Sequence, residues 1–161
     1  MTLDGLNEDF RDVVIAFADA EVEFLVVGAV ALAFHGAPRA SGDIDLLVRP
    51  SAENAARVFA ALKTFGAPLE AHGVIVEDFT RIGTVYQIGL PPRRIDILTR
   101  ISGLDFDEAW ASRVDALLER RTIHLIGRDA YIKNKLASGR PKDLADAARL
   151  GRGEPTGGED P

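Results

Sequence analysis

Cysteine is absent from the 161-residue sequence. Its absence excludes disulfide bonds and thiolate metal sites, so any metal ligands must be oxygen or imidazole groups. The three histidines, His35, His72 and His124, are far apart in the sequence and lack metal-ligand spacing. We expect His35 to pack at the end of a helix rather than to act in catalysis.

A long apolar run is also missing. The longest one, Phe24–Gly28 with a loose extension to Phe34, falls short of the roughly 20 residues that a membrane-spanning helix needs. The first ten residues are acidic and lack the basic start and apolar stretch of a signal peptide. The sequence therefore predicts a cytoplasmic protein without a membrane segment.

An excess of positive charge is lacking as well, because the net charge is −6. This charge argues against broad binding to duplex DNA, which depends on many phosphate contacts from Lys and Arg. It does not exclude a local basic pocket. With 47% hydrophobic residues, the length suits a single domain, predicted at residues 1–150, and the composition of residues 151–161 predicts a disordered tail.

Hydrophobic periodicity and turn residues predict a mixture of helices and strands. Helices are expected at residues 7–20, 29–35, 51–65, 106–113, 129–137 and 142–150. Strands are expected at 23–27, 43–48, 74–76, 84–88 and 94–98, and residues 116–126 are strand-like around a charged break. The predicted class is α+β, with one mixed sheet flanked by helices and a C-terminal helical pair.

Two acids lie close together in the predicted strand 43–48. Alternate residues of a strand share a face, so Asp43 and Asp45 point to one side while Ile44 and Leu46 point into the core. Two like charges on one face repel each other unless a cation lies between them, and Mg²⁺ is the usual cation for carboxylates and phosphates. The alternative is that Asp43 caps a turn and Asp45 lies on a solvated face.

A third acid, Asp96, is flanked by aliphatic residues in the predicted strand 94–98. If the two strands are neighbours, Asp43, Asp45 and Asp96 converge. Three carboxylates suffice to hold two metal ions about 4 Å apart for in-line phosphoryl chemistry.

The segments Val27-Gly28-Ala29 and Asp43-Ile44-Asp45-Leu46, followed by the strand acid Asp96, resemble the DNA polymerase beta-like nucleotidyltransferase superfamily. The resemblance implies a nucleotidyltransferase-like sheet flanked by helices, an NTP donor, and Mg²⁺ or Mn²⁺ held by the three acids. It also implies that Gly28 and Ala29 position phosphates. The usual turn in that superfamily is Gly-Gly or Gly-Ser, so Ala29 is a departure.

Residues 36–45 and 135–146 are similar to small bacterial proteins related to the AbiEii abortive-infection nucleotidyltransferase toxins. This resemblance implies that Lys135 neutralises phosphate charge and that Asp143 belongs to the nucleotide site. It also implies an antitoxin or another operon partner. Alternatively, Lys135 is a solvated helix residue, and Asp143 complements a helix N-terminus, with Arg140 pairing to it or to Asp146.

Further polar residues flank the acids. Arg39 is either a triphosphate contact or a surface arginine, and Ser41 contacts phosphate or caps a turn. Arg93 and Arg94 either guide phosphate or balance the carboxylates.

Three functions remain open. The first is a Mg²⁺-dependent nucleotidyltransferase that moves NMP from an NTP to a hydroxyl of RNA, including tRNA, of a protein or of a small molecule. The second is a module of the same fold that binds a partner without catalysis. The third is a phosphate- or metal-binding domain of unrelated fold, in which Asp96 lies far from Asp43.

Overall fold

The computed structural model describes residues 1–37 and 42–152. Its helices are α1 (Glu8–Asp19), α2 (Gly28–Phe34), α3 (Ala52–Phe65), α4 (Phe106–Ala111), α5 (Arg128–Ser138) and α6 (Pro141–Arg152), with a short 3₁₀ helix, η1, at Val76–Thr80. Its strands are β1 (Phe24–Val27), β2 (Ile44–Val48), β3 (Val85–Ile88), β4 (Ile95–Leu98), β5 (Val114–Leu118) and β6 (Arg121–Leu125).

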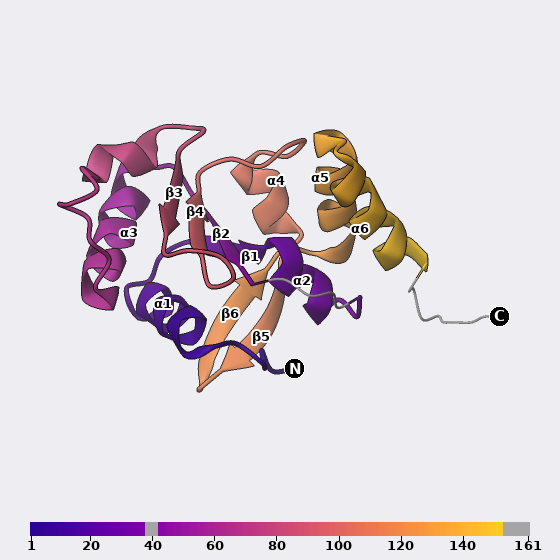
Figure 1. Cartoon of the computed structure of the whole chain (residues 1–161), viewed down its shortest axis with the longest axis horizontal. Helices are drawn as coiled ribbons and strands as arrows, with labels where there is room; N and C mark the ends of the chain where they lie inside the picture. The colour runs from indigo at the N-terminus through magenta and orange to yellow at the C-terminus, as the bar shows by residue number, and fades with distance from the viewer. Residues whose placement is uncertain (38–41, 153–161) are drawn as a thin grey trace.

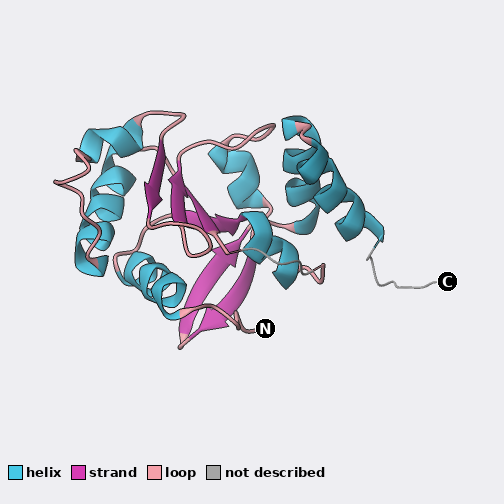
Figure 2. Cartoon of the chain, viewed as in Figure 1, coloured by secondary structure: helices cyan, strands magenta, loops and turns pink. Residues whose placement is uncertain are grey.

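The six strands form one mixed sheet in the order β3-β4-β2-β1-β6-β5. The pairs β2–β4 and β1–β6 are parallel, and the other three pairs are antiparallel. Helices α1 and α3 lie together at one side of the molecule, and α5 and α6 form a pair at the other (Figure 1). Helices therefore flank the central strands on both sides (Figure 2), as the α+β prediction requires.

The side of the sheet away from the acids is the main core. Ile44, Leu46 and Val48 of β2 are fully buried, as the alternation of residues predicts. Helix α1 adds Phe10, Val13, Val14 and Phe17 to the same hydrophobic cluster. Because these residues recur at helical spacing, they form one apolar face, which the sequence pattern made recognisable.

Local capping residues fix several helix ends. The Asn7 side chain accepts a hydrogen bond of 2.9 Å from the Phe10 amide and begins α1. The Ser51 hydroxyl accepts one of 3.2 Å from the Asn54 amide and begins α3. Side-chain acceptors of this kind satisfy amides that the first helical turn leaves without partners.

The predicted strand at 74–76 is wrong. Residues 74 and 75 are irregular, and Val76 begins η1. The carboxylate of Asp78 accepts a hydrogen bond of 2.9 Å from the Ile75 amide, and the Phe79 side chain is completely buried. A turn held by Asp78 brings Phe79 into the core, and this tertiary contact overrides the β propensity of the valines and isoleucine.

The charged break within residues 116–126 is a hairpin loop. Glu119 and Arg120 both adopt left-handed backbone conformations, with φ of 48° and 73°, and join β5 to β6. Two consecutive left-handed residues match the twist of a tight antiparallel hairpin.

The C-terminal helical pair is present, and α6 continues to Arg152. The first two residues of the predicted tail, 151 and 152, are therefore helical. The remainder of that tail lies outside the described residues, as do Arg39 and Ser41. Within residues 1–37 and 42–152, no helix combines the length and the apolar character that a membrane crossing requires.

Candidate nucleotidyl-transfer site

Asp45 and Asp96 lie side by side on neighbouring strands. β2 and β4 run parallel, and their register pairs Asp45 directly with Asp96. The two carboxyl groups share a hydrogen bond, and Asp96 is 7% exposed. Adjacent parallel strands thus bring together two acids that are far apart in the sequence.

The environment of Asp45 disfavours its charged form. Burial raises the pKa of Asp45 to about 7, and the hydrogen bond and negative charge of Asp96 act in the same direction, while the positive charge of Lys135 opposes them. A carboxyl pair that shares a proton at neutral pH is a place where a divalent cation can replace that proton.

Asp43 lies just before β2 and is joined to Asp96 through Arg94. The Arg94 guanidinium contacts Asp43 at 3.2 Å and Asp96 at 2.9 Å, and the Arg94 amide donates a hydrogen bond of 3.2 Å to Asp43. Hydrogen bonding and charge from Asp96 raise the pKa of Arg94. Of the two roles predicted for Arg94, the structure shows the balancing of the carboxylates.

Gly28 allows the backbone at the start of α2 to approach Asp45 closely. Its φ is +69°, and a Cβ at this position would lie 2.1 Å from Oδ2 of Asp45. Only glycine fits both the left-handed conformation and this contact. Ala29 follows in the first turn of α2 and lines the same cleft as Asp45.

Lys135 reaches the cleft from α5 and is held by a buried carboxylate of α6. Asp143 is 1% exposed and lies 3.6 Å from the Lys135 ammonium group. It also accepts hydrogen bonds of 2.6 Å from Ser138 and from Arg140. Burial alone would raise the pKa of Asp143, but the hydrogen bonds and the two cations hold it below its usual value.

These contacts revise the interpretation of Asp143. Its carboxylate faces Lys135, Ser138 and Arg140, which is the arrangement expected of a counter-ion that positions the cations. The predicted pairing of Arg140 with one of the two acids of α6 is confirmed, and the partner is Asp143.

A single cleft of about 460 Å³ collects these groups. The predicted site residues that line it are Gly28, Ala29, Asp43, Asp45, Asp96, Lys135 and Asp143. Arg94, Ser138, Arg140, Lys142 and Asp146 line it as well. The structure thus brings seven of the nine predicted site residues together in one cleft, and the other two, Arg39 and Ser41, lie outside the described residues.

The donor set suits Mg²⁺ or Mn²⁺. All three acids offer hard oxygen ligands, and Asp45 and Asp96 lie side by side in the cleft. Among the described residues, no three acidic or imidazole side chains form a ready-made metal cluster. Arg94 instead contacts both Asp43 and Asp96.

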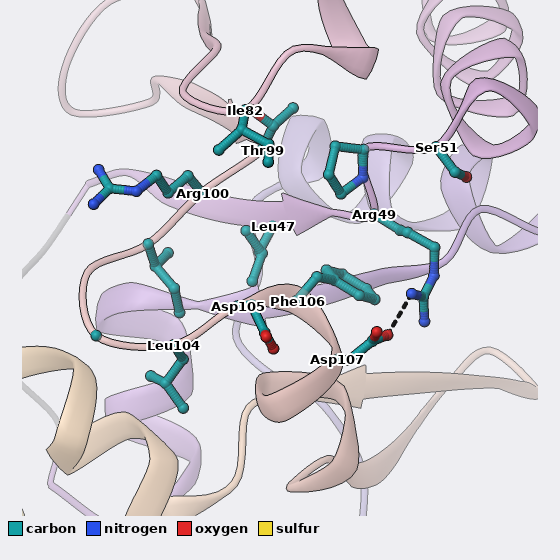
Figure 3. Close-up of a pocket in the computed structure, with 13 residues that line it drawn as sticks. Leu47, Arg49, Ser51, Ile82, Thr99, Arg100, Leu104, Asp105, Phe106 and Asp107 are labelled. Atoms are coloured by element: carbon teal, nitrogen blue, oxygen red, sulfur yellow. Dashed lines mark hydrogen bonds and ion pairs between the residues drawn. The ribbon is translucent and has the colours of Figure 1, made fainter.

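Two features of the site were not predicted. The amide group of Asn134 donates a hydrogen bond of 2.9 Å to the carbonyl of Ser102, which ties α5 to the segment after β4. A second pocket lies at the other end of β2 and β4, arranged around Leu47 (Figure 3). Neither has a local sequence signal, because each depends on segments that meet only in the folded chain.

Histidine contributes little to the cleft. His35 forms a hydrogen bond of 2.8 Å with the carbonyl of Ile126, as expected for a histidine packed at the end of a helix.

No protein-family model and no curated protein gives a significant match to the sequence. Solved structures, in contrast, share its fold. A candidate nucleotidyltransferase from Thermotoga maritima superposes with a TM-score of 0.57 at 15% identity, covering 94% of this chain and 97% of its own. The lincosamide antibiotic adenylyltransferase LnuA, bound to lincomycin, gives a TM-score of 0.54 at 14% identity, covering 92% of this chain and 98% of its own.

The chain therefore has the fold of nucleotidyltransferases. This result removes the third of the predicted possibilities, a domain of unrelated fold.

Proposed function

We propose that the protein is a nucleotidyltransferase that uses Mg²⁺ or Mn²⁺ to move NMP from an NTP to a hydroxyl acceptor. One observation carries the proposal. The Asp45–Asp96 carboxyl pair lies against the Gly28 turn in a cleft that also holds Lys135. Acids that bind a metal, a backbone turn open to phosphates and a cation are the components that phosphoryl transfer requires.

In the proposed reaction, the acceptor oxygen attacks the α-phosphorus, the bond to the leaving pyrophosphate breaks, and the acceptor proton passes to Asp96. Asp45 and Asp96 would hold the metal, with Asp43 completing the set, and the metal would neutralise charge on the phosphates. Gly28 and Ala29 would receive the triphosphate.

The cationic side of the cleft has a separate role. Lys135 and Arg140 would balance the negative charge that develops on the pyrophosphate as it leaves. Asp143 would act through them, by holding both cations at the cleft. Arg39 and Ser41 remain proposed phosphate contacts.

The AbiEii-type resemblance extends the proposal to a toxin–antitoxin or phage-defence setting with an encoded partner. Lys135 and Asp143, which come from a segment that carries the resemblance, contact each other in the cleft. Co-purification with the product of a neighbouring gene tests this setting.

Label transfer tests the enzyme proposal. Incubation with α-labelled NTPs and Mg²⁺ should release pyrophosphate and label an acceptor, whereas Asp45→Asn and Asp96→Asn should do neither. Labelling by the variants at the wild-type rate would contradict the roles of these acids.

A second candidate is a nucleotide-binding module without catalysis. Arg94 favours it, because this side chain already balances Asp43 and Asp96 as a metal would. Ala29, in place of the usual second glycine or serine, favours it as well. Binding of Mg²⁺–NTP with neither transfer nor pyrophosphate release would identify this alternative.

A further inference from the structure

The second pocket lies on the same face of the sheet as the acids. Because alternate residues of a strand share a face, Asp45, Leu47 and Arg49 follow one another along one side of β2 and its C-terminal end. Two residues of a strand span about 7 Å. Leu47, at the floor of this pocket, is therefore one such step from Asp45 of the cleft.

The pocket and the cleft also share a wall. Ile101 lines both, and the residues after it divide between them, with Ser102 in the cleft and Gly103 and Leu104 in the pocket. The pocket and the cleft are therefore adjacent along Ile101.

The lining of the pocket suits the apolar part of a small molecule. Leu47, Leu104 and Phe106 are nearly completely buried, whereas Ile82 is 73% exposed at the surface. These side chains surround the space together with Thr99 (Figure 3). The volume of about 560 Å³ lies within the range of small-molecule sites, which are mostly apolar with a few polar groups.

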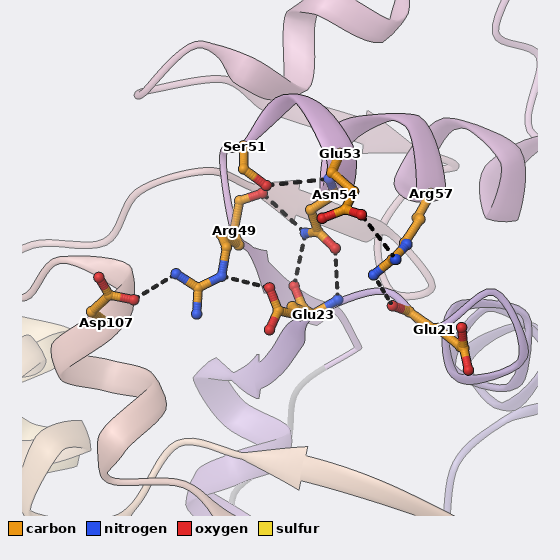
Figure 4. Close-up of polar contacts among 8 residues, drawn as sticks. All are labelled: Glu21, Glu23, Arg49, Ser51, Glu53, Asn54, Arg57 and Asp107. Atoms are coloured by element: carbon orange, nitrogen blue, oxygen red, sulfur yellow. Dashed lines mark hydrogen bonds and ion pairs between the residues drawn. The ribbon is translucent and has the colours of Figure 1, made fainter.

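One side of the pocket is held in place by a polar network. Arg49 pairs with Glu23 at 2.6 Å and with Asp107 at 2.5 Å, and its guanidinium lies 4.5 Å from the centre of the Phe106 ring. Asn54 donates a hydrogen bond of 3.0 Å to the Arg49 carbonyl (Figure 4). This network joins the end of β2 to α3 and α4, so the pocket is largely preformed.

The charges around the pocket favour a small molecule over a polynucleotide. The positive charge of Arg49 is balanced by two acids, and Asp105 adds a further negative charge. Of the described residues that line the pocket, only Arg100 is a cation without an ion-pair partner. Polynucleotide binding needs several such cations, because most of its affinity comes from phosphate contacts.

We propose that this pocket binds the apolar body of a small hydroxylated acceptor and directs its hydroxyl to Asp96. The inference rests on the proposed transfer reaction and specifies its acceptor class. The pocket would determine acceptor choice, whereas the cleft would bind the nucleotide.

Binding of an aryl alcohol tests the proposal. Amide NMR spectra of the full chain are recorded with benzyl alcohol and, separately, with the trinucleotide CCA. Benzyl alcohol should shift the amides of Leu47, Ile101 and Leu104. Ile82→Trp, which fills the mouth of the pocket, should weaken this binding by about tenfold or more. Ile101→Trp provides a second block if the new side chain at 82 turns to solvent.

Leu90→Trp is the matched control, because Leu90 is 80% exposed and lines neither the pocket nor the cleft. It should bind benzyl alcohol as the wild type does. If benzyl alcohol leaves the pocket amides unshifted, or if the trinucleotide shifts them instead, the proposal is overturned.

A parallel titration with Mg²⁺–ATP separates this inference from the proposed function. Shifts at Gly28, Asp45 and Lys135 report the nucleotide site. Their absence would sink the transfer reaction even if benzyl alcohol still binds the pocket. If Mg²⁺–ATP shifts these amides but benzyl alcohol does not bind the pocket, only the proposed acceptor class is overturned.

Discussion

The carboxyl group of Asp45 is buried beside another acid, so its charged form destabilises the folded state. Its pKa of about 7 means that the folded state holds a proton that the unfolded chain has released above its ordinary pKa near 3.8. The free energy of unfolding therefore falls as the pH rises from about 4 to 7, and the full penalty is present above 7.

Asp45→Asn should remove this penalty. In metal-free buffer at pH 8, the variant should be more stable than the wild type, and its stability should depend less on pH between 4 and 7. Urea denaturation across that range measures the effect, with the exposed Asp129→Asn as a control for charge removal. If the free energy of unfolding depends on pH in the same way in the wild type and in Asp45→Asn, burial does not raise the pKa of Asp45.

Asp143 represents the opposite case, because its contacts stabilise the charged form. Asp143→Asn should cost roughly 3 kcal/mol at pH 7, since it breaks a buried charge pair. The pKa of Asp143 is lowered in the folded state, so this contribution is present above its ordinary value of 3.8 and is lost below it.

Urea denaturation at pH 7 and again below pH 3.8 checks the effect of Asp143→Asn. The difference from the wild type should shrink at the acidic pH. The matched control is Asp129→Asn, because the side chain of Asp129 is 94% exposed and pairs with the neighbouring Arg128. An equal loss for both variants would rule out a special role for the buried carboxylate.

At the residue scale, the sequence predicted which residues gather in the cleft better than it predicted what they contact. Strand alternation was enough to predict that Asp43 and Asp45 face away from the buried Ile44. The bridging position of Arg94 was only one of two alternatives, because a side chain with several rotatable bonds is placed by partners from other segments.

At the scale of elements, the turn between β1 and α2 determines whether the proposed nucleotide site can form. Gly28→Ala should destabilise the protein by more than the roughly 1–2 kcal/mol that a left-handed alanine costs, because its Cβ also collides with Asp45. It should abolish Mg²⁺–NTP binding.

Gly36 provides a matched control at the other end of α2. Its φ is +99°, and nothing lies within 4 Å of a Cβ added there. In Gly36→Ala, the free energy of unfolding should therefore fall only by the cost of the left-handed backbone conformation. This variant should still bind Mg²⁺–NTP. Thermal denaturation and calorimetry of both variants make the comparison, and equal losses of binding would contradict the contact between Gly28 and Asp45.

Element prediction succeeded where a local signal acts alone. Apolar periodicity defined α1 and α3, and the charged break marked the hairpin between β5 and β6. Residues 74–76 were misassigned, because the burial of Phe79 is a tertiary contact that local propensity does not contain.

At the scale of the whole molecule, the site depends on the order of the strands. β4 pairs with β2 although a helix, η1 and an edge strand intervene in the sequence, and this pairing brings Asp96 to Asp45. The sequence supported their convergence only on the condition that the strands are neighbours. The second pocket was beyond prediction for the same reason, because its lining comes from β2, the segment after β4, and α4.

Mg²⁺-dependent NTP binding, measured by titration calorimetry on the wild type and Asp96→Asn, tests the central claim most directly. We predict saturable binding by the wild type that disappears when Mg²⁺ is removed and is lost in Asp96→Asn, with folding retained. NTP binding that persists without a divalent cation, or that is unchanged in Asp96→Asn, would contradict the assignment of the carboxyl pair as the metal site.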